Sequence, residues 1–152
     1  MYFVNRSEIE KIINFIDGLL EKSDSDFVYT TLSEKLMLER LTHLLIESIL
    51  DVGNLMIDGF IMRDPGSYHD IIDILIDERV LPKEDEEAYK QLIDLREQIV
   101  KYYTNINHEQ IKEVLSSHKH IFGKFSTYIK SYLTTELGVA NTFSNEEEGK
   151  DG

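Results

Sequence analysis

Apolar residues recur at intervals of three and four positions along most of the chain, rather than at every second position. This is the spacing of one face of an α-helix. Only two prolines and eight glycines interrupt the pattern, and these are the residues that most often break helices. We therefore predict an all-α fold, an antiparallel bundle of four to five helices. The helices are expected at about residues 7–23, 31–58, 82–103 and 107–136, with a short one starting at 67.

Most of these predicted helices begin at a residue that can cap the first free backbone amides. The caps are Ser7 with Glu10, Thr31 with Glu34, Ser67 with Asp70, and Asn107. Pro82 suits the first turn of the fourth helix, and Gly138 follows the end of the fifth. Residues 139–152 are polar and acidic and are expected to form a disordered tail. Residues 1–138 are then a single helical domain.

One arginine interrupts the apolar face of the fourth helix. At about 100° per residue, Arg96 falls near the centre of a face made by Tyr89, Leu92, Ile93, Ile99, Val100 and Tyr103. A guanidinium buried there requires a carboxylate or other acceptors. Alternatively, the side chain extends to an edge of the bundle.

The second helix offers acceptors in a narrow polar stripe, while nearly all its other positions are apolar, which is typical of a central helix. The stripe consists of Arg40, His43, Glu47, Asp51, Asn54 and Asp58. Two interpretations stay open. The stripe is the one hydrated side of the helix, or Glu47 or Asp51 pairs with Arg96. A bidentate pair would fix the register of the two helices and create a polar pocket.

The histidines are read mainly as structural. His118 lies among apolar residues of the fifth helix and is expected to be a hydrogen-bonded core residue, with an acid–base role as the alternative. His43 has glutamates four residues away on each side, but no second histidine completes a metal site. His108 and His120 are expected outside the core. The sequence contains no Gly-rich phosphate loop and no recognisable nucleophile motif.

The composition of the chain limits the classes of partner that it is expected to bind. The formal net charge of −13, from 29 acidic and 16 basic residues, argues against a broad basic surface for nucleic acid. DNA binding is therefore not expected, and any RNA contact must be local. The chain has no cysteine, so disulfides and thiolate sites are excluded. Charged residues interrupt the longest apolar stretch, 41–61, and the N-terminus lacks signal-peptide features. We expect a cytoplasmic protein without a membrane partner.

Three features together resemble a known family. The second helix contains HLLIESILDVGNLMID, and the short third helix lies in PGSYHDIIDILIDERVL. The fourth helix ends in Arg96, four residues, Lys101, one residue and Tyr103. Over about residues 7–132 the chain resembles the HepT-like branch of the HEPN superfamily, whose motif is arginine, four residues, histidine, one residue, tyrosine. The resemblance implies a small all-helical protein, usually dimeric; many members are ribonuclease toxins of two-component modules.

The resemblance also implies roles for the motif residues. Arg96 would hold an RNA phosphate in a cleft between two protomers, close to the second and fourth helices. Lys101 stands where the family has its catalytic histidine, and Glu97 where asparagine is common. A lysine, with a reference pKa of about 10.4, is a poor base near neutral pH, but it can bind phosphate. Tyr103 matches the tyrosine that a nucleotidyltransferase antitoxin modifies in some members.

Helix geometry separates two of these residues. Lys101 projects about 140° away from Arg96 on an ideal helix. The two meet only if the helix loosens or if two protomers contribute different copies. As a cation in the last helical turn, Lys101 is also explained by the helix dipole alone.

Two functions are compatible with these observations. The first is a toxin-type HepT-like RNA endonuclease, or a catalytically weakened descendant, that needs neither metal nor cofactor. Its partners would be a second copy of the chain, RNA and a nucleotidyltransferase antitoxin. The second is a non-enzymatic helical dimer that binds a protein or a nucleotide, in which Arg96 and the acidic stripe are structural.

Overall fold

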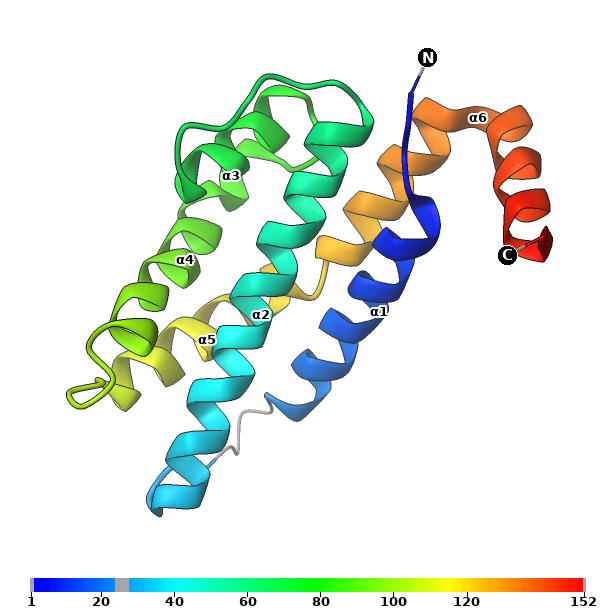
Figure 1. Ribbon diagram of the computed structural model, residues 1–152. Coiled ribbons are helices and arrows are strands. Elements are labelled where there is room, and N and C mark those ends of the chain that lie inside the picture. The colour runs from blue at the N-terminus through cyan, green and yellow to red at the C-terminus, as the bar shows by residue number, and fades with distance from the viewer. Residues whose placement is uncertain (1, 24–27, 152) are drawn as a thin grey trace.

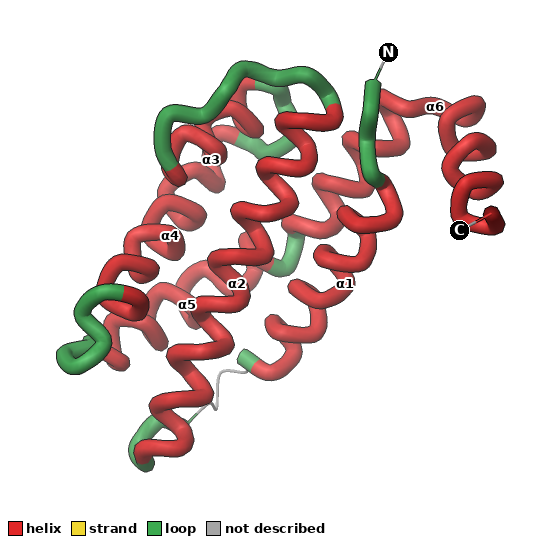
Figure 2. Tube along the Cα trace, viewed as in Figure 1, coloured by secondary structure: helices red, strands yellow, loops and turns green. Residues whose placement is uncertain are grey.

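The computed structural model describes the backbone of residues 2–23 and 28–151, with side chains as far as residue 138. Its elements are α1 (Arg6–Lys22), α2 (Leu32–Gly59), α3 (Tyr68–Asp77), the 3-10 helix η1 (Lys83–Asp85), α4 (Glu86–Val100), α5 (His108–Phe122) and α6 (Phe125–Asp151). All regular structure in the described ranges is helical (Figure 2). The all-α prediction is confirmed.

Helix α2 is the centre of the bundle. It packs against α1 on one side and against α3 and α4 on the other, while α5 also contacts it and the first part of α6 runs along α1 (Figure 1). Buried side chains therefore come from most of the circumference of α2. This arrangement agrees with the expectation of a central helix that has one narrow polar side.

Local capping chemistry determines three of the helix starts. Thr31 accepts a hydrogen bond from the backbone of Glu34, whose side chain bonds back to Thr31 and completes a capping box. Ser67 caps α3 and Asn107 caps α5 in a similar way, each accepting from a backbone amide three residues on. These three starts are confirmed as predicted.

The start of α1 differs from the prediction. Asn5 accepts from the backbone N–H of Glu8, so the cap lies before Ser7, which is inside the helix. Asn5 and Ser7 can both serve as caps. The helix starts from Asn5 because the longer helix contains more backbone hydrogen bonds. At the start of the fourth predicted helix, Pro82 precedes η1 and not α4 directly.

The predicted fifth helix, 107–136, is two helices. It breaks at Gly123, and the chain turns between α5, which packs on α4, and α6, which packs on α1. Phe122 ends α5 and Phe125 begins α6, and both rings pack against buried Tyr89 of α4, with centroid distances of 5.6 and 5.9 Å. One aromatic cluster thus spans the break.

Gly138 departs from helical geometry inside α6, with φ 67° and ψ −176°. Only glycine adopts such a conformation without strain. It lies where the sequence predicted the end of the helix. The predicted disordered tail, residues 139–152, falls outside the residues whose side chains are described, and its disorder stays a prediction.

The close approach of α3 to α2 depends on Gly53. A Cβ atom added to Gly53 would overlap a methyl group of Ile71 and lie 3.6 Å from Leu75, both on α3. The absence of a side chain lets the two helices meet there. This contact sets the position of α3, whose first turn forms part of the site described next.

Candidate functional site

A surface pocket of about 350 Å³ lies between the start of α3 and the C-terminal half of α4. Its lining consists of Ser67, Tyr68, His69, Ile93, Asp94, Arg96, Glu97, Val100 and Lys101. The pocket therefore combines two cationic side chains and an aromatic ring with a histidine and the carboxylates of Asp94 and Glu97. The cations and the ring suit an anionic group attached to a planar base.

Glu47 of α2 holds Arg96 of α4. Arg96 Nε donates to Glu47 Oε1 over 2.6 Å, and His43 Nε2 lies 3.3 Å from the same oxygen. The Tyr68 ring packs against the guanidinium, with 4.8 Å between Cζ and the ring centre. The hydrogen bond with Glu47 raises the pKa of Arg96 above its ordinary value, so the side chain stays cationic. The prediction that an acid of the second helix meets Arg96 is confirmed for Glu47.

The pair uses only one edge of the guanidinium. Among the described residues, Arg96 makes its hydrogen bond through Nε alone. The pair therefore has one hydrogen bond and differs from the bidentate pair that was predicted. Nη1 and Nη2 keep their donors, and the side chain is 26% exposed. The remaining N–H groups of a planar guanidinium can donate two parallel hydrogen bonds to two oxygens of one phosphate.

Arg96 lies at the margin of the buried face of α4 and not at its centre. The buried residues of the helix are Ala88, Tyr89, Leu92, Ile93 and Leu95. Val100 is 39% exposed and Tyr103 is 69% exposed, so the predicted face is wrong at its C-terminal end. The reason is that α4 ends at Val100, and Tyr103 belongs to the loop that follows.

Arg96 and Lys101 flank the pocket from two edges of α4. Lys101 keeps a helical hydrogen bond from its N–H to the carbonyl of Glu97 (2.8 Å). Its side chain therefore projects well away from that of Arg96, as predicted. Glu97 and Val100 lie between the two cations on the helix, and the pocket spans all four residues. Both cations line the pocket within one chain, and the helical hydrogen bond at Lys101 is kept.

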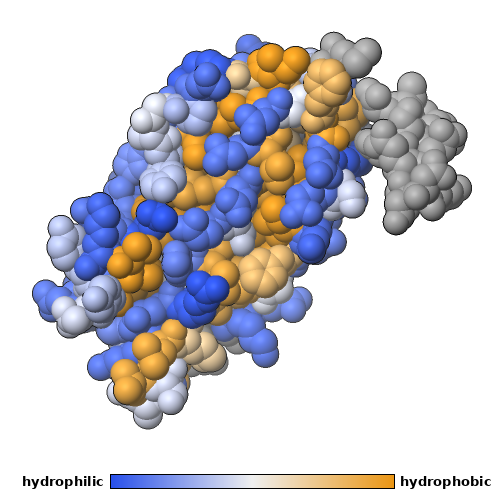
Figure 3. All heavy atoms as spheres, viewed as in Figure 1, coloured by the Kyte–Doolittle hydropathy of each residue, from blue (hydrophilic) through white to orange (hydrophobic). Residues whose placement is uncertain are grey.

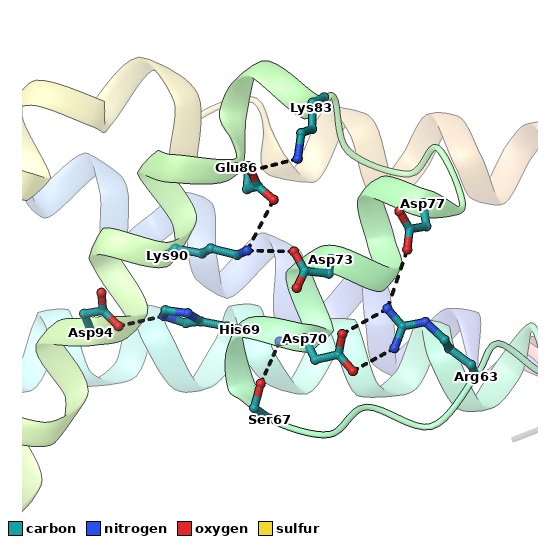
Figure 4. A network of polar contacts seen from close by, with 10 residues as sticks. All are labelled: Arg63, Ser67, His69, Asp70, Asp73, Asp77, Lys83, Glu86, Lys90 and Asp94. Atoms are coloured by element: carbon teal, nitrogen blue, oxygen red, sulfur yellow. Dashed lines mark hydrogen bonds and ion pairs between the residues drawn. The ribbon is translucent and has the colours of Figure 1, made fainter.

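An ion-pair network fixes α3 against α4 (Figure 4). Arg63 in the preceding loop donates two hydrogen bonds to the carboxylate of Asp70, at 2.7 and 2.9 Å. Lys90 of α4 reaches Asp73 of α3 at 2.7 Å. The hydrogen bonds from Arg63 lower the pKa of the Asp70 carboxyl. Together these contacts hold the first turn of α3 at the pocket.

A histidine–aspartate pair joins the two helices within the pocket. His69 Nε2 lies 2.6 Å from Asp94 Oδ1 (Figure 4). The two side chains are 42% and 65% exposed, so solvent and ligands can reach them. The sequence did not indicate this pair, because its members are 25 positions apart and neither belongs to the motif. The one available signal was a histidine in the first turn of the predicted third helix.

Asp51 does not share the role of Glu47. It is exposed on α2, one turn beyond Glu47. Partial burial and the negative charge of Glu47 raise the pKa of its carboxyl. Most of the polar stripe on α2 is therefore hydrated, which was one of the two interpretations of the sequence. Glu47 alone pairs with Arg96, which was the other.

The other histidines lie outside this pocket. His118 Nε2 is 2.8 Å from Gln91 Oε1 and is half-buried, as expected for a hydrogen-bonded packing residue. His108, expected outside the core, is instead half-buried and lies 2.6 Å from Glu39. His120 is exposed as predicted.

In the part of the chain that the structure describes, no three metal-ligating side chains come together. The described helices include none with the length and apolar character to cross a membrane.

Comparisons with known proteins place the chain in a family. The family model "Ribonuclease HepT-like" matches residues 9–129, so the chain belongs to the HepT-like ribonuclease family. The chain is 45% identical over 143 residues to "Putative RNase YutE" of Bacillus subtilis (strain 168), covering 94% of this chain and 99% of that protein.

A solved structure supports the fold. It is described as "Structure of Cytosolic Protein of Unknown Function YutE from Bacillus subtilis", and it superposes with a TM-score of 0.88 at 46% identity. The match covers 91% of this chain and 96% of that one. The helical bundle and the elements that form the pocket are therefore those of a HepT-like protein.

Proposed function

We propose that the protein acts on RNA as an endoribonuclease of the toxin–antitoxin type, with the pocket between α3 and α4 as its phosphate-binding site. The observation that carries this proposal is the Arg96 guanidinium, which Glu47 holds through Nε while both terminal nitrogens keep their donors. Membership of a ribonuclease family supports it. The proposed reaction uses side chains alone.

Lys101 supplies a second cation to the same pocket. Arg96 binds two phosphate oxygens through its fork, whereas Lys101 acts as a flexible point charge. Two clustered cations are compatible with a net charge of −13, because the attraction is confined to the pocket. RNA contacts outside the pocket are expected to be few.

We also propose that a second copy of the chain covers the rim of this pocket. Large side chains are exposed there and in the following loop: Tyr68 (48%), Val100 (39%), Tyr102 (58%) and Tyr103 (69%). In Figure 3, groups of apolar side chains interrupt the polar surface on the face from which α2 is seen. In a chain whose rim a second copy does not cover, the exposed Tyr103 would be accessible to a nucleotidyltransferase antitoxin. A cytoplasmic location is proposed with this function.

The alternative function is a non-enzymatic helical dimer that binds a protein or a nucleotide. Lys101 favours this alternative, because the family places its catalytic histidine at that position. In that case the Arg96–Glu47 pair would be structural, and the pocket would bind a phosphate without cleaving it.

Cleavage of transfer and messenger RNA by the purified protein tests the proposal. Arg96→Ala is expected to reduce the cleavage rate by about 10²–10³-fold, the usual effect of removing one donor to a transition-state charge. Lys130→Ala removes an exposed cation from α6 and serves as the matched control, with no change expected. Cleavage that persists in Arg96→Ala would remove Arg96 from the mechanism.

Two further outcomes separate the alternatives. An unaltered chain that binds but does not cleave RNA would favour the non-enzymatic dimer. Lys101→His restores the family motif, and cleavage gained only in that variant would identify a catalytically weakened descendant.

A further inference from the structure

The proposed reaction requires a proton acceptor, and neither cation of the pocket is one. A guanidinium has five donors and no acceptor, and an ammonium has three donors and no acceptor. Cleavage through the neighbouring ribose hydroxyl needs a group that removes the hydroxyl proton. Lys101 occupies the motif position of the family base, so the base has to come from elsewhere.

Of the described histidines, His69 is the one that lines the pocket with Arg96 and Lys101. His43 is outside the pocket lining, with its Nε2 3.3 Å from Glu47 Oε1. His108 and His118 are engaged with Glu39 and Gln91 away from the pocket. His69 is therefore the histidine that shares a pocket with both cations, where a bound phosphate would lie.

The pairing with Asp94 leaves one imidazole nitrogen available as an acceptor. A carboxylate only accepts hydrogen bonds, so His69 donates from Nε2 to Asp94 Oδ1 over 2.6 Å. In the neutral ring, Nδ1 then carries the lone pair. A base whose second nitrogen is held by a carboxylate is the arrangement that orients histidines in acid–base catalysis.

We infer that His69 is the general base of this site and Asp94 its positioning residue, an inference that rests on the proposed ribonuclease function. His69 Nδ1 removes the proton of a ribose 2′-hydroxyl. The 2′-oxygen then attacks the adjacent phosphorus, whose charge Arg96 stabilises. The bond between phosphorus and the 5′-oxygen breaks, and the Lys101 ammonium gives a proton to that oxygen.

The products are a 2′,3′-cyclic phosphate and a 5′-hydroxyl end. The imidazolium of His69 and the neutral amine of Lys101 return to their starting states by exchanging one proton through solvent. Atoms and charge balance without an oxidant, a reductant or a further reactant. The fixed first turn of α3 keeps the imidazole at the pocket during this cycle.

Chemical rescue tests this inference. His69→Ala is expected to lower single-turnover RNA cleavage by at least about 10²-fold, while affinity for an uncleavable 2′-O-methyl RNA stays within twofold. Added imidazole should restore part of the lost rate, because it can occupy the vacated position. His120→Ala, an exposed histidine of α5, is the control and should cleave normally. Circular dichroism verifies that each variant is folded.

Asp94 has its own readout. Asp94→Asn should reduce kcat by about tenfold and leave KM unchanged, and Asp94→Glu should recover part of the rate. A structural role would instead change thermal stability and KM together. Equal kcat in Asp94→Asn and the unaltered protein would remove Asp94 from this role.

The outcomes distinguish this inference from the proposed function. Loss of cleavage in Arg96→Ala together with full cleavage in His69→Ala would overturn the role of His69 and leave the ribonuclease function standing. Loss in both variants, with imidazole rescue only in His69→Ala, supports the inference. Absence of cleavage by the unaltered protein would overturn both.

Discussion

At the scale of single residues, Glu47 Oε1 accepts a hydrogen bond from Arg96 Nε and lies 3.3 Å from His43 Nε2. The two contacts restrain the carboxylate, and the carboxylate in turn restrains the guanidinium at the margin of the bundle. Arg96 thus lines the pocket with its two terminal nitrogens unused by Glu47 and without complete burial. The position combines a stable orientation with access for a ligand.

Glu47→Gln should lower the free energy of unfolding by about 1 kcal/mol. The pair is partly exposed, at 26% and 35%, so solvent screens it; loss of a fully buried pair would cost about 3–5 kcal/mol. Urea denaturation at pH 7 measures the change. Asp58→Asn, at an exposed position of the same helix, is the control. Equal stability of Glu47→Gln and the unaltered protein would contradict a restraining role for the pair.

Asp51→Asn should stabilise the protein slightly at pH 7, by a few tenths of a kcal/mol for a largely exposed group. Folding raises the pKa of the Asp51 carboxyl above its ordinary value of 3.8. The native state therefore holds this proton more tightly, and the ionised group costs stability at neutral pH. The gain should shrink as the pH falls toward 3.8. Urea denaturation at pH 7 and pH 4 measures it, and a gain that grows at pH 4 would contradict the shift.

The need of Arg96 for an acidic partner could be predicted from the sequence, since a guanidinium on an apolar face needs an acceptor. The choice of Glu47 over Asp51 could not, because the two lie one turn apart on one stripe. The axial offset between α2 and α4 brings Arg96 to Glu47, 2.6 Å away, and this offset is a tertiary property. His69 and Asp94 also come together only through the packing of α3 on α4, which local sequence signals do not encode.

At the scale of elements, Gly53 allows α3 to pack on α2. Gly53→Ala should lower the free energy of unfolding by about 1–3 kcal/mol, because the new methyl group overlaps Ile71 and overpacking outweighs the gain in helix propensity. Gly18→Ala in α1 meets no atom within 4 Å and should stabilise by about 0.5–1 kcal/mol. Thermal unfolding compares the two. Equal effects would show that α3 moves freely to accommodate the methyl group.

Three of the helix starts could be predicted from the sequence. The caps Thr31, Ser67 and Asn107 act within one turn, so their signals are local. The break at Gly123 could not be predicted, because the apolar spacing continues through Phe122 and Phe125 across it. That break arises from packing: α5 follows α4, while α6 follows α1.

At the scale of the whole molecule, the exposed pocket rim predicts self-association. Val100→Asp places a charge at the rim and should convert a dimer into monomers. Phe15→Asp alters a similarly exposed apolar residue of α1, 47% exposed, and should leave the dimer intact. Sedimentation velocity measures both variants. Monomeric unaltered protein at micromolar concentration would contradict dimerisation through this face.

Arg96 is the proposed RNA phosphate ligand in a molecule whose net charge is −13. The most direct test is the affinity of the purified protein for a short 2′-O-methyl RNA, measured by fluorescence anisotropy at fixed salt. Because one charge-assisted contact contributes about 1.5–3 kcal/mol, Arg96→Ala should weaken binding by about 10–100-fold, with Lys130→Ala unchanged. Equal affinities of the unaltered protein and Arg96→Ala would contradict the account.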